Sequence, residues 1–130
     1  MISRDEVLMG RDVEYPLTPE LEANLDKLLY ALNIFRELYG KPMVVSSGYR
    51  PGHYNSDAHG AKHSNHIICL AADFHDPLGE IDQYITLDNE QILASAGLWR
   101  EAQASTPGWV HLQCVPFKSY QPGNTRSFKP

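Results

Sequence analysis

The sequence predicts a small α+β domain in which one long helix near the N-terminus precedes an antiparallel sheet. A leucine stripe at helical spacing dominates residues 18–40, and the chain after it alternates short apolar stretches with turn-forming residues. There is no internal repeat, low-complexity segment or linker. Because 130 residues suit one ordinary domain, we expect residues 1–130 to form a single domain, with an irregular lead-in at 1–17 and an irregular tail at 116–130.

The long helix has a start signal, a periodic face and a stop signal. Thr18 is a typical N-cap, and Pro19 suits the first helical position. Gly40, followed by Pro42, ends the pattern. Apolar side chains recur at alternating steps of four and three, which places on one face Leu21, Leu25, Leu28, Leu32 and Phe35. We predict an amphipathic helix that packs on the core.

Four short stretches predict strands. Residues 43–47 and 67–74 are rich in β-branched and small side chains, and a polar loop at 48–60 precedes the second of them. Residues 98–101 and 109–115 predict an antiparallel pair. We expect an antiparallel sheet that helices cover on one side.

A helical region is expected between the second and third of these strands. It follows residue 79 and is broken near Thr86. Asp88 is a candidate cap for its second part, and Gly97 is the expected end.

The composition excludes several classes of protein. The formal charge is −5, from 11 basic and 16 acidic residues, which argues against nucleic-acid binding. No apolar run approaches the roughly 20 residues that span a bilayer, so no membrane insertion is expected. The first residues lack the basic segment and apolar core of a secretory signal. We expect a monomer that is cytoplasmic at synthesis.

The two cysteines are expected to be reduced and buried. Two are too few for a disulfide framework. If both lie on strands, alternation places Cys69 on the face of Asp73 and Cys114 on the face opposite His111. That geometry disfavours a bridge between them.

Two histidines and one aspartate form a candidate metal site. His66 and Asp73 lie seven residues apart at the start of an apolar run, and His111 follows downstream in a second one. Two imidazoles and one carboxylate suit a catalytic zinc site, in which the fourth position stays open. The simpler alternative is that these histidines bind no metal and the chain is an ordinary α+β domain.

The spacing around His66 resembles the Ser-x-His-x-x-Gly-x-Ala-x-Asp signature of the M15 peptidases. This family comprises D-alanyl-D-alanine carboxypeptidases and endolysins, and it shares its core with hedgehog domains. Ser64, His66, Ala71 and Asp73 match, while Cys69 stands at the glycine. Two further segments resemble the second histidine motif and the substrate-binding segment of the family, namely Trp109-Val110-His111 and Ser47-Gly48-Tyr49-Arg50-Pro51. Two others resemble the short, phage-associated members, namely Gly97-Leu98-Trp99-Arg100-Glu101 and Pro122-Gly123-Asn124.

The resemblance implies a hedgehog/DD-peptidase fold and one zinc ion bound by His66, Asp73 and His111. It also implies that Arg50 grips a substrate carboxylate or carbonyl, for which a planar guanidinium is well shaped. Ser64 would bond the substrate or fix the metal loop. The alternatives are a structural ion pair for Arg50 and a turn serine at Ser64.

Two aromatic residues complete the substrate site that the resemblance implies. Tyr49 and Trp109 would wall the cleft. Their alternative role is packing in the core, which is common for aromatic residues in strands.

The general base is the least complete part of the pattern. Many family members carry an acidic residue three positions before the second zinc histidine, where this chain has Gly108. Glu101, in the preceding predicted strand, is our candidate, because a hairpin would return it beside His111 and phage-type relatives resemble the chain there. His59 and His63 remain alternatives as base or as surrogate ligand.

Two functions follow from these observations. The first is a zinc metallopeptidase that hydrolyses peptidoglycan stem peptides, as a D-Ala-D-Ala carboxypeptidase or an L-Ala-D-Glu endopeptidase. The second is a zinc-containing module with little or no activity that binds cell-wall peptide or a phage structural partner. Either would reach the cell wall after release from the cytoplasm or by delivery in a virion.

Overall fold

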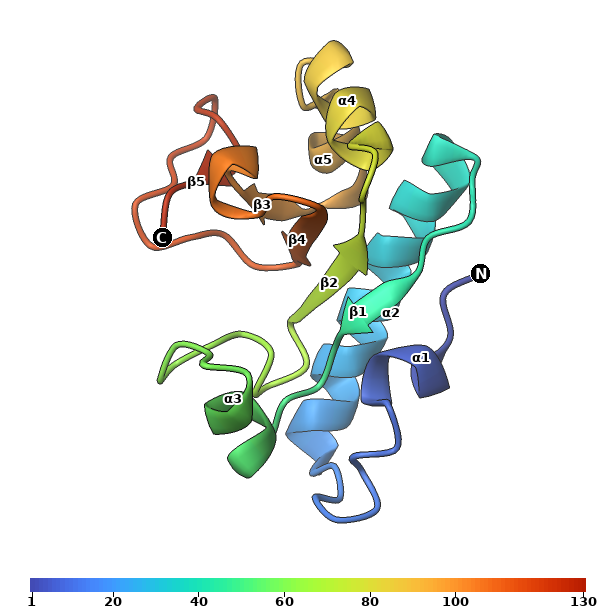
Figure 1. Cartoon of the computed structure of the whole chain (residues 1–130), viewed down its shortest axis with the longest axis vertical. Coiled ribbons are helices and arrows are strands. Elements are labelled where there is room, and N and C mark those ends of the chain that lie inside the picture. The colour runs from blue at the N-terminus through green and yellow to red at the C-terminus, as the bar shows by residue number, and fades with distance from the viewer.

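The computed structural model describes residues 1–130, and its secondary structure confirms an α+β domain. The helices are α1 (Arg4–Leu8), α2 (Pro19–Tyr39), α3 (His53–Asp57), α4 (Glu80–Leu87) and α5 (Gln91–Ala96), with a 3₁₀ turn at Gln103–Ser105. The strands are β1 (Val45–Ser47), β2 (Ala71–His75), β3 (Trp99–Glu101), β4 (Trp109–Gln113) and β5 (Ser127–Phe128). Figure 1 shows their arrangement from the N-terminus in blue to the C-terminus in red.

The sheet has the order β1-β2-β4-β3-β5 and is mixed. Its neighbours pair antiparallel, as predicted, except that β5 pairs parallel with β3. Our prediction of an irregular tail was therefore wrong at β5, and so was that of a wholly antiparallel sheet. A strand of two residues is too short to show alternation in the sequence.

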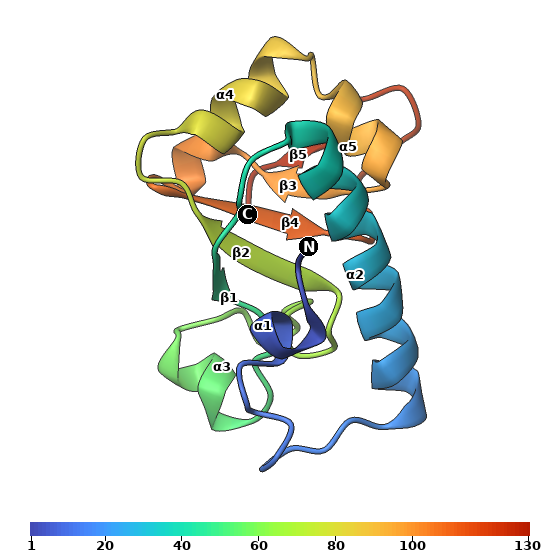
Figure 2. The same cartoon turned by 90° about the vertical axis from the view of Figure 1, so that its right-hand side faces the viewer.

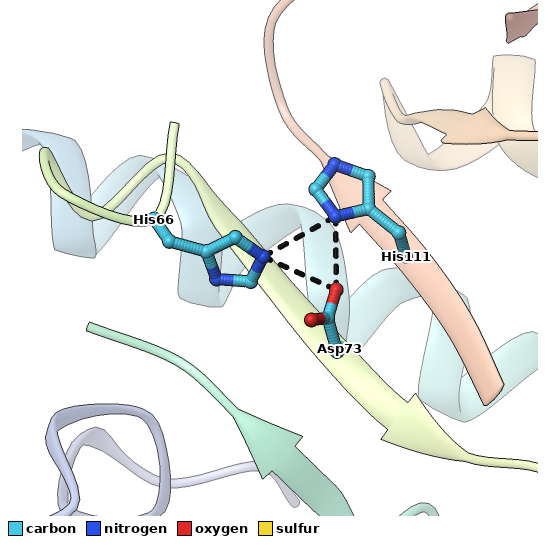
Figure 3. Close-up of side chains that lie close together, drawn as sticks. All are labelled: His66, Asp73 and His111. Carbon is cyan, nitrogen blue, oxygen red and sulfur yellow. Dashed lines mark hydrogen bonds and ion pairs between the residues drawn. The ribbon is translucent and has the colours of Figure 1, made fainter. Parts of the chain in front are cut away.

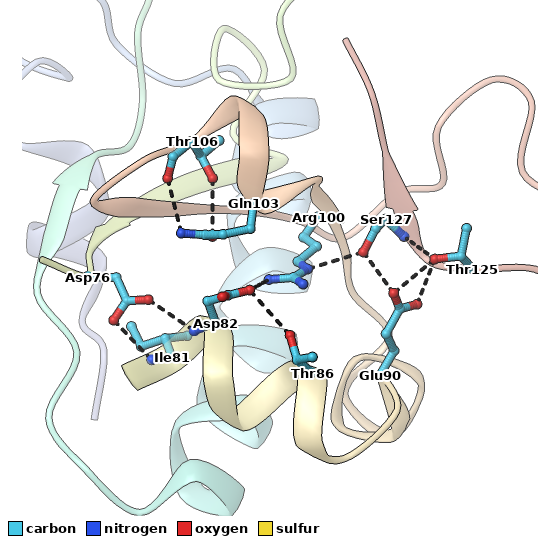
Figure 4. Close-up of polar contacts among 10 residues, drawn as sticks. All are labelled: Asp76, Ile81, Asp82, Thr86, Glu90, Arg100, Gln103, Thr106, Thr125 and Ser127. Carbon is cyan, nitrogen blue, oxygen red and sulfur yellow. Dashed lines mark hydrogen bonds and ion pairs between the residues drawn. The ribbon is translucent and has the colours of Figure 1, made fainter. Parts of the chain in front are cut away.

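Polar contacts hold β5 in place, as Figure 4 shows. The guanidinium of Arg100 on β3 donates to Asp82 Oδ1 on α4 (2.7 Å) and to Ser127 Oγ on β5 (3.1 Å). The carboxylate of Glu90 accepts from Ser127 Oγ (2.8 Å) and from the backbone N–H of Arg126 (2.7 Å). The tail is thus bound to the sheet by side chains far away in the sequence.

The prediction for the long helix is confirmed. The Thr18 side chain accepts a hydrogen bond from the Leu21 N–H, and Gly40 ends α2 in the left-handed conformation (φ 80°). Figure 2 shows α2 running along one side of the sheet, with α4 and α5 at one end and α3 at the other. The side chains that α2 buries are Leu25, Leu28, Ala31, Leu32 and Phe35.

The lead-in is more ordered than predicted, because it contains α1. A capping box between Ser3 and Glu6 begins this helix, and it buries Val7 and Leu8. The Val7 carbonyl accepts a hydrogen bond from the Tyr49 N–H (2.9 Å), which ties α1 to the segment after β1. A single turn of helix carries too little periodicity to predict from sequence.

Two predicted boundaries need correction. The second strand begins at Ala71 rather than at residue 67, because residues 64–69 form a turn in which Cys69 takes a left-handed conformation (φ 60°). Asp88 ends α4 and does not cap α5, which follows Glu90 (φ 65°). The break between α4 and α5 and the end at Gly97 are as predicted.

The cysteines are both buried and unpaired, as expected. Burial raises the pKa of the Cys69 thiol to about 12 and that of Cys114 to about 11. Neither thiol is therefore ionised near neutral pH. None of the helices combines the length and the apolar composition that a bilayer crossing requires.

Candidate metal centre

One row of side chains crosses the sheet and supplies most of the site. In the β2–β4 register Asp73 lies opposite His111, and in the β1–β2 register it lies opposite Ser47. The β3–β4 register, continued by one residue, sets Glu101 opposite His111, and Phe128 is the partner of Glu101 on β5. Paired residues point to the same face of a sheet. The row therefore gathers an imidazole and two carboxylates on one face.

His66 reaches the same place from the turn before β2. The Ser64 hydroxyl accepts a hydrogen bond from the His66 N–H (3.1 Å), and the His66 carbonyl accepts one from the Arg50 N–H (2.9 Å). The ring Nδ1 of His66 lies 2.9 Å from the Gly48 carbonyl oxygen. Only glycine fits at Gly48, because a Cβ there would lie 2.1 Å from the Val7 carbonyl oxygen.

The three side chains converge on one point (Figure 3). Asp73 Oδ1 lies 2.9 Å from His111 Nδ1 and 3.2 Å from His66 Nε2, and the two nitrogens are 3.3 Å apart. All three residues are buried, with exposed fractions of 2% to 6%. Two imidazole nitrogens and a carboxylate oxygen within 4.8 Å of one another can hold a metal ion. The donor set fits zinc.

The electrostatics prepare Asp73 and His66 for a metal ion, whereas His111 holds a proton that the ion has to displace. Burial raises the pKa of the Asp73 carboxyl, but the close contacts of its Oδ1 with His111 Nδ1 and His66 Nε2 outweigh burial and hold it well below its usual range. Burial lowers the pKa of His66, which keeps that imidazole neutral. For His111 burial lowers the pKa, but the hydrogen bond to Asp73 outweighs it and raises the pKa above its usual value. A cation would replace that proton between the same two groups.

A cavity of about 350 Å³ opens onto this triad. Four residues that the sequence predicted for the site line it, namely Arg50, Ser64, Glu101 and Trp109, and so does the alternative base His59. Tyr49 does not line it: this side chain is 2% exposed and its hydroxyl donates to the Tyr15 carbonyl oxygen (3.1 Å). His63 also lies outside the lining.

Arg50 is a half-buried cation with no acidic partner. Its Nη2 donates to Ser64 Oγ (3.2 Å), but no carboxylate oxygen lies within 4.0 Å of its nitrogens. Its Nε is buried without a hydrogen-bond partner. Burial lowers the pKa of the guanidinium, which still stays charged at any physiological pH. The structural ion pair considered as its alternative role is absent.

Glu101 is a half-buried carboxyl that faces the triad from β3. Burial raises its pKa, and the charge of Asp73 adds to that effect, while His111 and Arg50 act in the opposite direction. The net pKa lies above the usual glutamate value. A raised pKa in a cavity is typical of a general base that works near neutral pH.

Sequence reasoning missed some residues that contact the triad. Gln113 Oε1 lies 2.8 Å from His111 Nε2, and the alternation of β4 would have placed both side chains on one face. The Phe128 ring centre lies 6.0 Å from that of His111. Nothing in the sequence of the tail indicates this contact, because it depends on the pairing of β5 with β3.

A protein-family model also matches the chain. The model described as Peptidase M15 matches residues 9–112, well over half of the chain. The chain belongs to the M15 peptidase family. The match contains His66, Asp73 and His111 as well as Arg50 and Glu101, and it confirms the resemblance seen in the motifs. Neither a search of curated proteins nor a search of solved structures found a match. Membership of the M15 family implies a peptidase, and the buried His–Asp–His group fits a metal site.

Proposed function

We propose that this M15 protein is a zinc-dependent peptidase that hydrolyses the stem peptides of bacterial peptidoglycan. The observation that carries the proposal is the buried His66–Asp73–His111 triad at the floor of a cavity that also holds Arg50 and Glu101. Zinc, when bound there, supplies Lewis-acid chemistry that polarises a carbonyl group and makes water more acidic. The protein would act as a monomer on wall peptide, after release from the cytoplasm or delivery in a virion.

Glu101 is the proposed general base. It takes a proton from the attacking water and passes it to the leaving amine. Gly108 has φ +83°, a conformation that would strain an acidic residue at that position. Glu101 instead approaches from the neighbouring strand, opposite His111. His59 is its competitor within the cavity.

Arg50 is the proposed substrate grip. An unpaired, half-buried guanidinium beside the triad favours an anionic ligand group, because a carboxylate would provide the bidentate partner that the protein does not. Ser64 accepts from Arg50 and so orients it. In both candidate bonds, D-Ala-D-Ala and L-Ala-D-Glu, the residue after the scissile bond carries a carboxylate that Arg50 would bind. Arg50→Lys should raise KM about tenfold and leave zinc affinity unchanged, since a lysine lacks the planar fork.

The test is turnover of purified muropeptides by the wild-type chain, with and without a chelator, and by two histidine variants. We expect cleavage that a chelator abolishes and added zinc restores. His66→Ala should be inactive, whereas His75→Ala, an exposed histidine at the end of β2, should behave as wild type. Cleavage that survives both chelation and His66→Ala would contradict the metal mechanism.

A second candidate function is binding of wall peptide or a phage structural partner without turnover. The glycine at position 108, where family members carry an acid, is the observation that favours it. Bound zinc without hydrolysis, together with unchanged peptide binding by Glu101→Ala, would support this function over the enzyme.

A further inference from the structure

Gln113 occupies a buried position at the back of the metal site. It lies on β4 two residues beyond His111, so both side chains point to the same face of the sheet. Its exposed fraction is 3%, and its partners in the neighbouring strands are Ala71 and Trp99. A buried amide at such a position needs a partner for each of its polar atoms.

The orientation of the Gln113 amide is fixed by a backbone group. Its Nε2 donates to the Val115 carbonyl oxygen (2.8 Å), and a carbonyl oxygen only accepts. The amide oxygen must therefore face the other way, toward His111 Nε2, which lies 2.8 Å from it. Since an amide oxygen also only accepts, His111 Nε2 must carry a hydrogen.

This hydrogen bond decides which nitrogen of His111 is available to a metal ion. With the hydrogen on Nε2, a neutral imidazole has its lone pair on Nδ1, the atom that faces Asp73 Oδ1 and His66 Nε2. His66 shows the mirror arrangement, because its Nδ1 faces the Gly48 carbonyl oxygen and its Nε2 faces the triad. The two histidines thus present different ring nitrogens, each selected by an oxygen that can only accept.

We propose that Gln113 is a positioning residue for the metal: it holds His111 in the tautomer and the ring orientation that offer Nδ1 as a ligand. The inference rests on the proposed binding of zinc by the triad. Partners of this kind typically change metal affinity by about 10-fold to 100-fold when they are removed. Gln113 differs from Gly48 in that its acceptor belongs to a side chain, so substitution can remove it.

The experiment measures the zinc dissociation constant by competition with a chromophoric chelator. Gln113→Met keeps the approximate size of the side chain and removes the strong acceptor, and we expect zinc to bind about 10-fold to 100-fold more weakly. Gln113→Glu keeps an acceptor oxygen for His111 Nε2 but gives up the donor to Val115, so it should bind zinc more tightly than Gln113→Met. Gln83→Met, on the exposed surface of α4, is the matched control and should not differ from wild type.

A second readout follows the tautomer itself. In ¹⁵N spectra of the zinc-loaded chain, the His111 Nε2–H should be protected from exchange in wild type and in Gln113→Glu, and lose that protection in Gln113→Met. The signals of His66 should stay unchanged in all three, since Gly48 holds that ring.

The outcomes separate this inference from the proposed function. A wild-type chain that binds no zinc overturns the proposed function and the inference with it. If wild type binds zinc and Gln113→Met binds it with equal affinity, the inference alone is overturned. If Gln113→Met does not fold, a His111 Nε2–H that exchanges rapidly in the zinc-loaded wild type overturns it in the same way.

Discussion

The two faces of the sheet carry opposite chemistry although the same strands build them. On β4, Leu112 has no exposed surface and packs with the helices, whereas its neighbour His111 points into the metal cavity. On β2, Phe74 and Asp73 divide in the same way. Alternation along a strand is what allows adjacent residues to serve two purposes.

The residues that stabilise the fold and those of the candidate metal site lie on opposite faces of the sheet. Burial of apolar surface against α2, α4 and α5 stabilises the helix-facing side. The cavity side instead buries Asp73 between two histidines and leaves Arg50 without an acidic partner. Burial of these charged groups destabilises the fold unless bound ligands of opposite charge pair with them. Substitutions on one face should therefore affect folding, and those on the other should affect metal binding and turnover.

The largest effect is expected on the cavity face. His111→Ala removes a ligand, so muropeptide turnover should fall by at least about 10³-fold, more than the loss of one oxyanion donor causes. Circular dichroism should still show a folded chain, because the helix-facing side is unchanged. Measurable turnover at the wild-type rate would contradict the assignment of His111 as a ligand.

The neighbouring residue should give the opposite result. Leu112→Ala creates a cavity on the helix-facing side, and the free energy of unfolding should fall by about 2–5 kcal/mol. Chemical denaturation measures that loss. At a temperature where the variant is folded, its zinc content should equal that of wild type, and loss of zinc would show that the two faces are not independent.

Glu101 tests whether the cavity face contains the base as well as the metal ligands. A base must be deprotonated to act, so kcat/KM should fall as the pH drops through the pKa of Glu101, which burial raises above the usual glutamate range. Glu101→Gln should lower turnover by about 10²-fold or more, with zinc still bound.

His59→Gln is the matched control for the identity of the base. It should leave the acidic limb of the pH profile in place. If His59→Gln removes that limb while Glu101→Gln leaves turnover unchanged, His59 is the base.

The smallest effect is expected at Cys69, which adopts a left-handed conformation at the glycine of the family motif. Cys69→Ala keeps the strain and loses the buried thiol, whereas Cys69→Gly relieves the strain. We expect the glycine variant to be more stable than the alanine variant by about 1 kcal/mol, the reverse of the order at most buried positions. Thermal unfolding of the two variants measures the difference. If the alanine variant is the more stable, backbone strain is not the reason why the family motif has glycine at this position.

The elements with strong local signals could be predicted from the sequence. The caps and leucine stripe of α2 and the β3–β4 pair are local features, and their predictions are confirmed. The structure also brings together the three ligands that the family resemblance predicted, two of them through the β2–β4 register. The helix and the hairpin depend on residues close in sequence, whereas the three ligands could be predicted only from the family motifs.

Features that depend on distant contacts and belong to no family motif were missed. Glu90 and Arg100 bind the tail at β5, and alternation along β4 places Gln113 on the face of His111 without predicting the hydrogen bond between them. Tyr49 was predicted to wall the cleft, but the bond of its hydroxyl to the Tyr15 carbonyl and its burial place it in the core. A motif match identifies the segment but not the direction of each side chain.

The most direct test of the zinc site is the zinc content of the purified chain beside that of Asp73→Asn, measured by elemental analysis after dialysis. This substitution keeps the size of the side chain and removes the carboxylate that both histidines face. We expect one zinc ion per wild-type chain and none retained by Asp73→Asn. Zinc absent from the wild type, or retained equally by the variant, would contradict it.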